Sequence, residues 1–503
     1  MLRSKKNVYV FTIAILLIIS SCGREGADEP DSHAEESPNI TEESYSNYND
    51  KATHAAEPYQ DVFYNMPAHV LSILVPDYLM HPAMGTPFRR AEESMRQMWA
   101  ETGQRFELDV TTMAFDSFSY MITRLEVMMM AGDAFDMFYV IPGLHNIWRY
   151  SQAGFLADIY ALMDESPNTS REDFFTNVLD AYAIDGGLYV FPLNFSLQYF
   201  AINATLPQEF IDRFIKKNTV SYAELMLMYL DLQREFGDEY GHLLISCNVG
   251  AMYSTGVLVR KISDFIDLNT RVSYLNDNSF ADILANIQHV QAIGGFGIDR
   301  GVAFAGPIPD RRRRRIDSEQ FIFISDSLTR HPFYVFFEPN AQYFSHHIPL
   351  ANHEGGLLLN PLQQIAPAFA IYSDGESALA WEFMQHLIPV MTMIVPENIN
   401  RTMAIPIKQA YLVPHFSALF EEYADLLHDH FNFLGMQDGN EREDSIHHAM
   451  ERLWAFAQMP IASMPWVPAG MFEDDLDQLL RGLITPRDAA VRMHNRMALW
   501  LIE

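Results

Sequence analysis

The order of apolar and polar residues predicts alternating strands and helices in the first part of the folded body. Residues 68–75 (AHVLSILV) form an aliphatic run, which is typical of a buried strand. Thr86 and Pro87 then mark the start of a helix, and Gly103 marks its end. A second strand is predicted over 105–115, where apolar residues alternate with polar ones.

The same alternation continues along the chain. A helix is predicted to begin after Asp116, to bury a methionine-rich face and to end at Gly132. A third short strand covers 136–140. The order strand, helix, strand, helix, strand predicts a parallel sheet in an α/β domain.

Later segments predict a second α/β lobe and helices in the C-terminal part. A helix over 222–236 is followed by a buried strand over 243–248, and another helix covers 373–388. The last helix has Thr485 at its N-cap and Asp488 three residues later, which is close to a capping box.

The first residues have the pattern of a signal peptide. Three basic residues precede an apolar run of twelve residues, 8–19. A helix of that length spans about 18 Å, which is short of the ~30 Å hydrocarbon core of a bilayer. We therefore expect residues 1–22 to be a signal sequence and not a transmembrane anchor.

The apolar run ends in Ile19-Ser20-Ser21-Cys22, which resembles a bacterial lipobox. The resemblance implies that Cys22 carries acyl chains and becomes the mature N-terminus, anchored at the outer face of the cell membrane. The alternative is an ordinary secretory signal with an incidental cysteine. The following residues are acidic and polar, with nine acids and one base in 23–50, so we expect 23–66 to be a disordered tether.

Composition and charge narrow the classes of protein. The 503 residues carry a formal net charge of −31, which argues against a nucleic-acid partner. Two cysteines, Cys22 and Cys247, exclude a disulfide framework, and Cys247 lies in a buried-strand context that favours an inert thiol. The length favours two or more domains over a single core.

Five stretches in order resemble the extracellular solute-binding protein family 1, which serves ABC importers, in the branch that includes maltose-binding protein. Phe135 departs from the family pattern, in which proline is usual at that position. The stretches are 130–137 (MAGDAFDM), 150–158 (YSQAGFLAD), 185–192 (DGGLYVFP), 378–387 (ALAWEFMQHL) and the ending 481–503.

The resemblance implies two α/β lobes that are joined by chain crossings and close over a ligand held between them. Lobe 1 would comprise 67–195 and 366–405, and lobe 2 would comprise 196–365 and 406–503. It implies a monomer without a cofactor. Such a protein captures a carbohydrate, in particular an oligosaccharide, and delivers it to the membrane subunits of an importer. The alternatives are a lipoprotein that presents its ligand to a sensor kinase and a secreted glycoside hydrolase, which needs two facing carboxylates.

The family pattern also indicates which residues border the cleft. Aromatic residues make up 13% of the chain, and a sugar site needs aromatic platforms and planar polar groups. Trp466 is the expected stacking platform. The expected ligand contacts are His145, Asn146, Asn194, Ser196, Asn248, Tyr253, Asp326, Ser327 and Trp466.

Other motifs give no catalytic or metal site. The sequence contains no P-loop, no G-x-S-x-G and no H-E-x-x-H, so we expect no enzyme activity. The paired histidines lack the spacing of a metal-ligand set, and no metal is expected. The arginine run 311–315 is interpreted as a solvated loop, with contact to an anionic partner as the alternative.

The lipobox generates the first prediction. Replacing Cys22 by alanine should release the protein from the membrane fraction or block its processing, because the thiol is the site of acylation. Cell fractionation and mass spectrometry of the N-terminal peptide measure both effects. Unchanged membrane retention, with processing at a different residue, would contradict the lipid anchor.

Overall fold

The computed structural model describes the folded body of the chain with several gaps. The described residues are 68–80, 86–114, 118–141, 144–248, 263–268, 270–299, 320–327, 344–352, 354–359, 367–392, 405–412, 414, 447, 451, 454–464, 466–468 and 470–502. Cys22, the acidic segment before residue 67, Tyr253 and the arginine run 311–315 lie outside them. The hypotheses that rest on those residues stay hypotheses.

The first of two large sheets contains the three strands predicted from the aliphatic runs. Its strand order is β2-β1-β3-β13-β4. The strands are β1 (Ala68–Pro76), β2 (Arg105–Met113), β3 (Met137–Tyr139), β13 (Ala368–Ile371) and β4 (Phe191–Pro192). β1 is parallel to β2 and β3, whereas β13 is antiparallel to β3 and β4. The predicted α/β arrangement is therefore confirmed.

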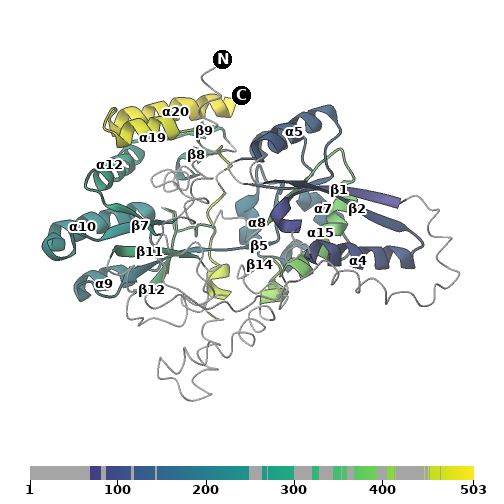
Figure 1. The fold of residues 1–503 in the computed structure, drawn as a ribbon, viewed down its shortest axis with the longest axis horizontal. Coiled ribbons are helices and arrows are strands. Elements are labelled where there is room, and N and C mark those ends of the chain that lie inside the picture. Colours follow the sequence, from purple (N-terminus) through teal and green to yellow (C-terminus); the bar gives the residue numbers. More distant parts are fainter. Residues whose placement is uncertain are drawn as a thin grey trace, which may run out of the picture.

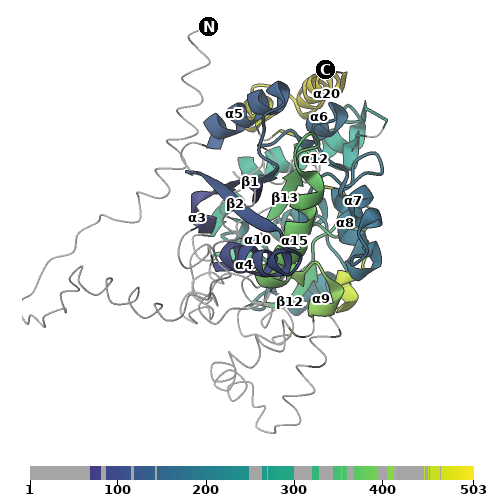
Figure 2. The ribbon, with the colours of Figure 1, turned by 90° about the vertical axis from the view of Figure 1, so that its right-hand side faces the viewer.

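Three long helices accompany this sheet, namely α4 (Thr86–Glu101), α5 (Phe118–Ala131) and α15 (Ser377–Thr392). α4 and α15 lie side by side, as Figure 2 shows. Leu71, Ile73, Leu74 and Val75 of β1 are at most 1% exposed, as expected for a strand covered on both faces. α15 begins four residues later than predicted, directly after the backbone N–H of Glu376 donates to Asp136 Oδ1.

The second sheet has the order β10-β7-β11-β6-β12. Its strands are β10 (Phe296–Asp299), β7 (Leu244–Asn248), β11 (Phe321–Ser327), β6 (Gln198–Asn203) and β12 (Phe344–Pro349). β7 is parallel to β10 and β11, and β6 is antiparallel to β11 and β12. The helices are α9 (Gln208–Ile215), α10 (Tyr222–Tyr240) and α12 (Asn278–Ala292), and Figure 1 shows them beside this sheet.

The chain passes between the two sheets at short crossings. It leaves β4 at Pro192 and enters β6 at Gln198, and between them β5 (Asn194–Phe195) pairs with β14 (Ile405–Pro406). It returns between β12 and β13. The two-lobe α/β architecture with crossings therefore agrees with the predicted fold class, whereas the lobe boundaries stay a prediction.

The C-terminal helices α19 (Glu473–Leu480) and α20 (Pro486–Ile502) lie over α12, as Figure 1 shows. The predicted capping box is present, because Asp488 N–H donates to Thr485 Oγ1 (3.1 Å) and Thr485 N–H donates to Asp488 Oδ2 (3.4 Å). Within the described residues, no helix has both the length and the apolar character needed to cross a bilayer.

Short elements connect the larger ones. They are α3 (Asp77–Met80), α6 (Ile147–Gln152), α7 (Ile159–Glu165), α8 (Thr176–Tyr182), the hairpin β8 (Ile266–Asp267) with β9 (Val272–Ser273), and the single-turn 3-10 segments η3 (Arg171–Asp173), η4 (Ser263–Phe265) and η6 (Gln409–Tyr411). In the sequence α6 lies between β3 and β4 of the first sheet, and the β8–β9 hairpin lies between β7 and β10 of the second.

Candidate functional site

The predicted ligand contacts fall at strand ends and on the first crossing. His145 and Asn146 follow the carboxyl end of β3, and Asn248 ends β7. Asn194 and Ser196 lie on the crossing itself. In open α/β sheets ligands bind outside the carboxyl ends of parallel strands, so these positions suit a cleft between the lobes.

The imidazole of His145 is held in place by its own loop. The side chain is 3% exposed, Nδ1 accepts the backbone N–H of Ile141 at 2.9 Å, and the ring lies 5.7 Å from that of Phe138. Burial lowers the pKa of His145 from 6.5 to about 4, so the ring is neutral at pH 7. Its Nε2 is buried and has no hydrogen-bond partner within the described structure.

The neighbouring candidates are also largely engaged or buried. Asn146 is the N-cap of α6, where its Oδ1 accepts the backbone N–H of Arg149 at 3.4 Å. Asn194 and Ser196 are 1% and 2% exposed. Asn194 Oδ1 has no hydrogen-bond partner among the described residues, whereas Ser196 Oγ donates weakly to Leu197 O at 3.5 Å.

The end of β11 lies beside the first crossing. Ser327 is opposite Gln198, and Asp326 is opposite Tyr199, in the antiparallel register of β11 with β6. Gln198 is two residues from Ser196, so the backbone at 326–327 approaches the crossing. Asn248 pairs with Asp299 at the end of β7. The structure thus brings the strand-end candidates and the crossing candidates to the same edge of the second sheet.

A pocket of about 460 Å³ lies between segments that are far apart in the chain. Ala183 and Ile184, which follow α8, form one wall, and the β8–β9 hairpin forms another. The remaining lining comes from Asn352, Glu354 and Gly356 and from residues 460–464, 466 and 467. Its polar side chains are Asp264, Asp267, Tyr274, Asn352, Glu354 and Ser463.

Among the described residues, Trp466 is the one predicted ligand contact that lines this pocket. It is 1% exposed, and its ring meets that of Tyr182 edge-on with the centroids 5.8 Å apart. Its Nε1 is buried and has no partner in the described structure. The indole is therefore packed into the wall of the pocket against Tyr182. Its role as a stacking platform stays a prediction.

The polar residues of the pocket were missed by reasoning from the sequence. Asn352 is the clearest example, because its Oδ1 accepts the backbone N–H groups of Glu354 (3.1 Å) and Gly356 (2.8 Å). An Asn with two glycines three and four residues later, Gly355 and Gly356, indicates a turn. Nothing in the sequence places that turn near Ile184 or Trp466, which are more than a hundred residues away.

No protein-family model matches the sequence of this chain, and a comparison with curated proteins also finds no match. Solved structures do match. A protein of Synechococcus sp. MITs9220 assigned to the oligosaccharide periplasmic-binding proteins is 14% identical, with a TM-score of 0.52 over 86% of this chain and 99% of the other. Its complex with zinc gives the same identity and coverage with a TM-score of 0.50.

An ABC substrate-binding protein of Listeria monocytogenes, in complex with cycloalternan, is 12% identical over 86% of this chain and 99% of the other, with a TM-score of 0.49. The two Synechococcus structures are sufficient to define the fold, which is that of the periplasmic solute-binding proteins. The resemblance predicted from the sequence segments is therefore confirmed at the level of the fold.

His145 generates a pH prediction. Its pKa is lowered in the folded state, so the unfolded chain binds the extra proton first, and stability falls as the pH drops from 6.5 toward 4. Between pH 6.5 and pH 4 the free energy of unfolding should fall by about 3 kcal/mol because of His145. His145→Asn keeps an acceptor for Ile141 N–H but cannot titrate, so urea unfolding should show its stability converging on that of the original chain at low pH. Parallel pH profiles would contradict this.

Trp466 generates a second prediction at this site. Because the ring is buried, Trp466→Ala should lower the free energy of unfolding by about 3–5 kcal/mol. Trp466→Phe, which keeps a ring against Tyr182, should lose less. Urea midpoints measure both variants. A midpoint for Trp466→Ala equal to that of the original chain would mean that the ring is not part of the packed wall.

Proposed function

We propose that this chain is a membrane-anchored solute-binding protein. It captures a carbohydrate of the oligosaccharide class between its lobes and delivers it to an ABC importer. The observation that carries the proposal is the passage of the chain between two α/β sheets at crossings, with β13 returning to the first sheet. That arrangement lets two rigid lobes close on a ligand without unfolding either one.

The chemistry at the cleft edge supports a hydroxyl-rich ligand. Asn194 and Ser196 place an amide and a hydroxyl on the crossing. Planar amides and carboxylates orient sugar hydroxyls, and aromatic faces cover the apolar face of a pyranose. The Synechococcus neighbour is assigned to oligosaccharide binding, and the ligand class proposed for this chain agrees with that assignment.

The proposed protein holds its ligand and does not transform it. Recognition would rest on hydrogen bonds and stacking, with importer subunits taking the sugar after the lobes open. The acylated Cys22 would anchor the protein at the outer face of the cell membrane, and residues 23–66 would hold the lobes away from the lipid. The proposed delivery to an importer rests on the fold, and the proposed membrane anchor rests on the lipobox pattern.

A thermal-shift screen tests the proposal. Maltose, maltohexaose, xylohexaose and a uronic-acid oligomer would be compared with amino acids and short peptides as controls. A ligand that binds only the native state stabilises it by about 2.7 kcal/mol at a concentration of 100 times the dissociation constant. We expect a neutral oligosaccharide to raise the melting temperature. A response to peptides alone would contradict the carbohydrate assignment.

Chromatography of the same sugar after incubation distinguishes binding from hydrolysis. Unchanged oligosaccharide is expected, because the proposal assigns no general acid or nucleophile. If an activity that cleaves the oligosaccharide copurifies with the protein, the function would be glycoside hydrolysis and not binding. That reaction requires two carboxylates on either side of the bond that is cleaved.

A further inference from the structure

The pocket of about 460 Å³ has walls that backbone hydrogen bonds hold together. Met464 N–H donates to the carbonyl of Ala181, near the end of α8, at 2.8 Å. Leu357 N–H donates to Pro460 O at 2.7 Å, and Ala462 N–H donates to Leu357 O at 2.9 Å. The volume lies within the range of about 300–1,000 Å³ that is usual for small-ligand sites. The pocket is therefore a pre-formed cavity of a size that suits a small ligand.

Among the described residues that line this pocket, every charged side chain is a carboxylate. Asp264 lies on η4 and Asp267 ends β8, while Glu354 belongs to the turn that Asn352 closes. Carboxylates are negatively charged at neutral pH. A concave site lined by charges of one sign raises the local concentration of ligands of the opposite sign. The pocket therefore favours a cationic group over a neutral or an anionic one.

The arginine of the hairpin is engaged at another place. Arg271 has a left-handed backbone, with φ 56°, and its guanidinium donates to Gln152 Oε1 at 2.8 Å. The same guanidinium lies over the ring of Trp148, 5.4 Å from the centroid. Arg271 is not one of the residues that line the pocket. The hairpin thus contributes two acids to the lining, and its base contacts α6.

Two aromatic side chains of the pocket suit a sugar. Tyr274 is 52% exposed, so the face of its ring is available to cover the apolar face of a pyranose. Trp466 is 1% exposed, and its buried Nε1 has no hydrogen-bond partner in the described structure. A buried N–H without an acceptor is unfavourable, so a ligand oxygen that accepts from it gains binding free energy. The pocket therefore combines a lining that attracts cations with groups that recognise a sugar ring.

We propose that this pocket is the part of the binding site that selects an amino sugar, in which an ammonium group replaces a hydroxyl of the ring. The carboxylates hold the ammonium through charge-assisted hydrogen bonds, which are stronger than hydrogen bonds between neutral groups. Tyr274 covers the sugar ring, and Trp466 Nε1 donates to one of its oxygens. This inference rests on the proposed carbohydrate-binding function and adds the charge of the ligand to it. Neutral oligosaccharides bind, and their amino derivatives bind more tightly.

Isothermal titration calorimetry with three sugars of one linkage tests the role of charge. The sugars are the β-1,4-linked trimer of glucosamine, its N-acetylated form and the glucose trimer. The glucosamine and glucose trimers differ only in an ammonium or a hydroxyl at one carbon of each ring, and acetylation removes the charge at that position. Titration at about pH 6 keeps both the amines and the carboxylates charged. We expect the glucosamine trimer to bind about tenfold more tightly than the other two, with a smaller difference at high salt.

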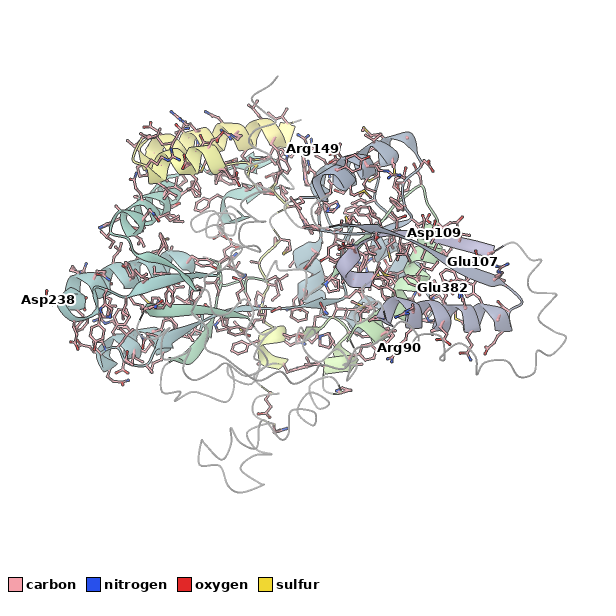
Figure 3. The ribbon with its side chains drawn as sticks, in the orientation of Figure 1. Arg90, Glu107, Asp109, Arg149, Asp238 and Glu382 are labelled. Carbon is pink, nitrogen blue, oxygen red and sulfur yellow. The ribbon has the colours of Figure 1, made fainter. Side chains whose placement is uncertain are left out.

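Variants that remove one charge each show whether the pocket causes this preference. Asp264→Asn and Glu354→Gln change the lining. Asp238→Asn is the matched control, because Asp238 is exposed and Figure 3 shows it at the outer edge of the molecule near the end of α10. We expect each pocket variant to lower the ratio of glucosamine-trimer to glucose-trimer affinity severalfold, while Asp238→Asn leaves this ratio unchanged.

Circular dichroism verifies that each variant is folded. If Asp264→Asn does not fold, Asp267→Asn takes its place, because asparagine keeps an Oδ1 acceptor for the N–H of Thr270, which Asp267 binds at 3.0 Å.

The outcomes separate this inference from the proposed function. Equal affinities for the glucosamine and glucose trimers, or a preference that the pocket variants leave unchanged, would overturn the selection of an amino sugar and leave oligosaccharide capture standing. A glucosamine trimer that does not bind, while another oligosaccharide of the thermal-shift screen does, would have the same consequence. Binding of spermidine or a lysine-rich peptide without binding of any sugar would overturn both this inference and the carbohydrate assignment.

Discussion

The fold depends on the return of the chain to its first sheet. β13 lies between β3 and β4, so the sheet that begins at residue 68 is complete only when 368–371 have been inserted. Asp136 secures this return from within the sheet. Its Oδ2 accepts the N–H and hydroxyl of Ser72, both at 2.7 Å, and its Oδ1 accepts the N–H of Glu376 at 2.9 Å. One carboxylate therefore joins β1, β3 and the start of α15.

This return makes the crossings short and places them side by side. Leu193 donates its backbone N–H to Pro367 and accepts that of Ile407, while Leu197 bridges to Leu359. Backbone pairing satisfies polar groups that would otherwise be buried without partners. The crossings thus lie side by side between the two sheets, and most of the buried residues of both sheets belong to one continuous hydrophobic cluster. This also explains why Asn194 and Ser196, predicted as ligand contacts, are nearly inaccessible in this arrangement.

Sequence patterns predicted the local elements better than their assembly. The aliphatic run of β1 and the capping residues Thr485 and Asp488 carry signals within a few neighbouring positions, and both elements were found as predicted. The place of β13 in the sheet and the approach of Asn352 to Ile184 depend on residues far apart in the chain, which periodicity cannot relate. The candidate site was predicted as positions along the chain, and the pocket side chains around Trp466 were missed for this reason.

Backbone strain provides information that composition does not. Asp185 and Arg271 look like ordinary charged surface residues in the sequence, and a solvated face would be the simplest interpretation of each. In the structure an unfavourable φ at Arg271 is combined with a guanidinium that contacts an amide and an indole on α6. Glycine would relieve the strain at this hairpin position but could make neither contact. Arginine at this position is therefore best explained by the contacts that its side chain makes with Gln152 and Trp148.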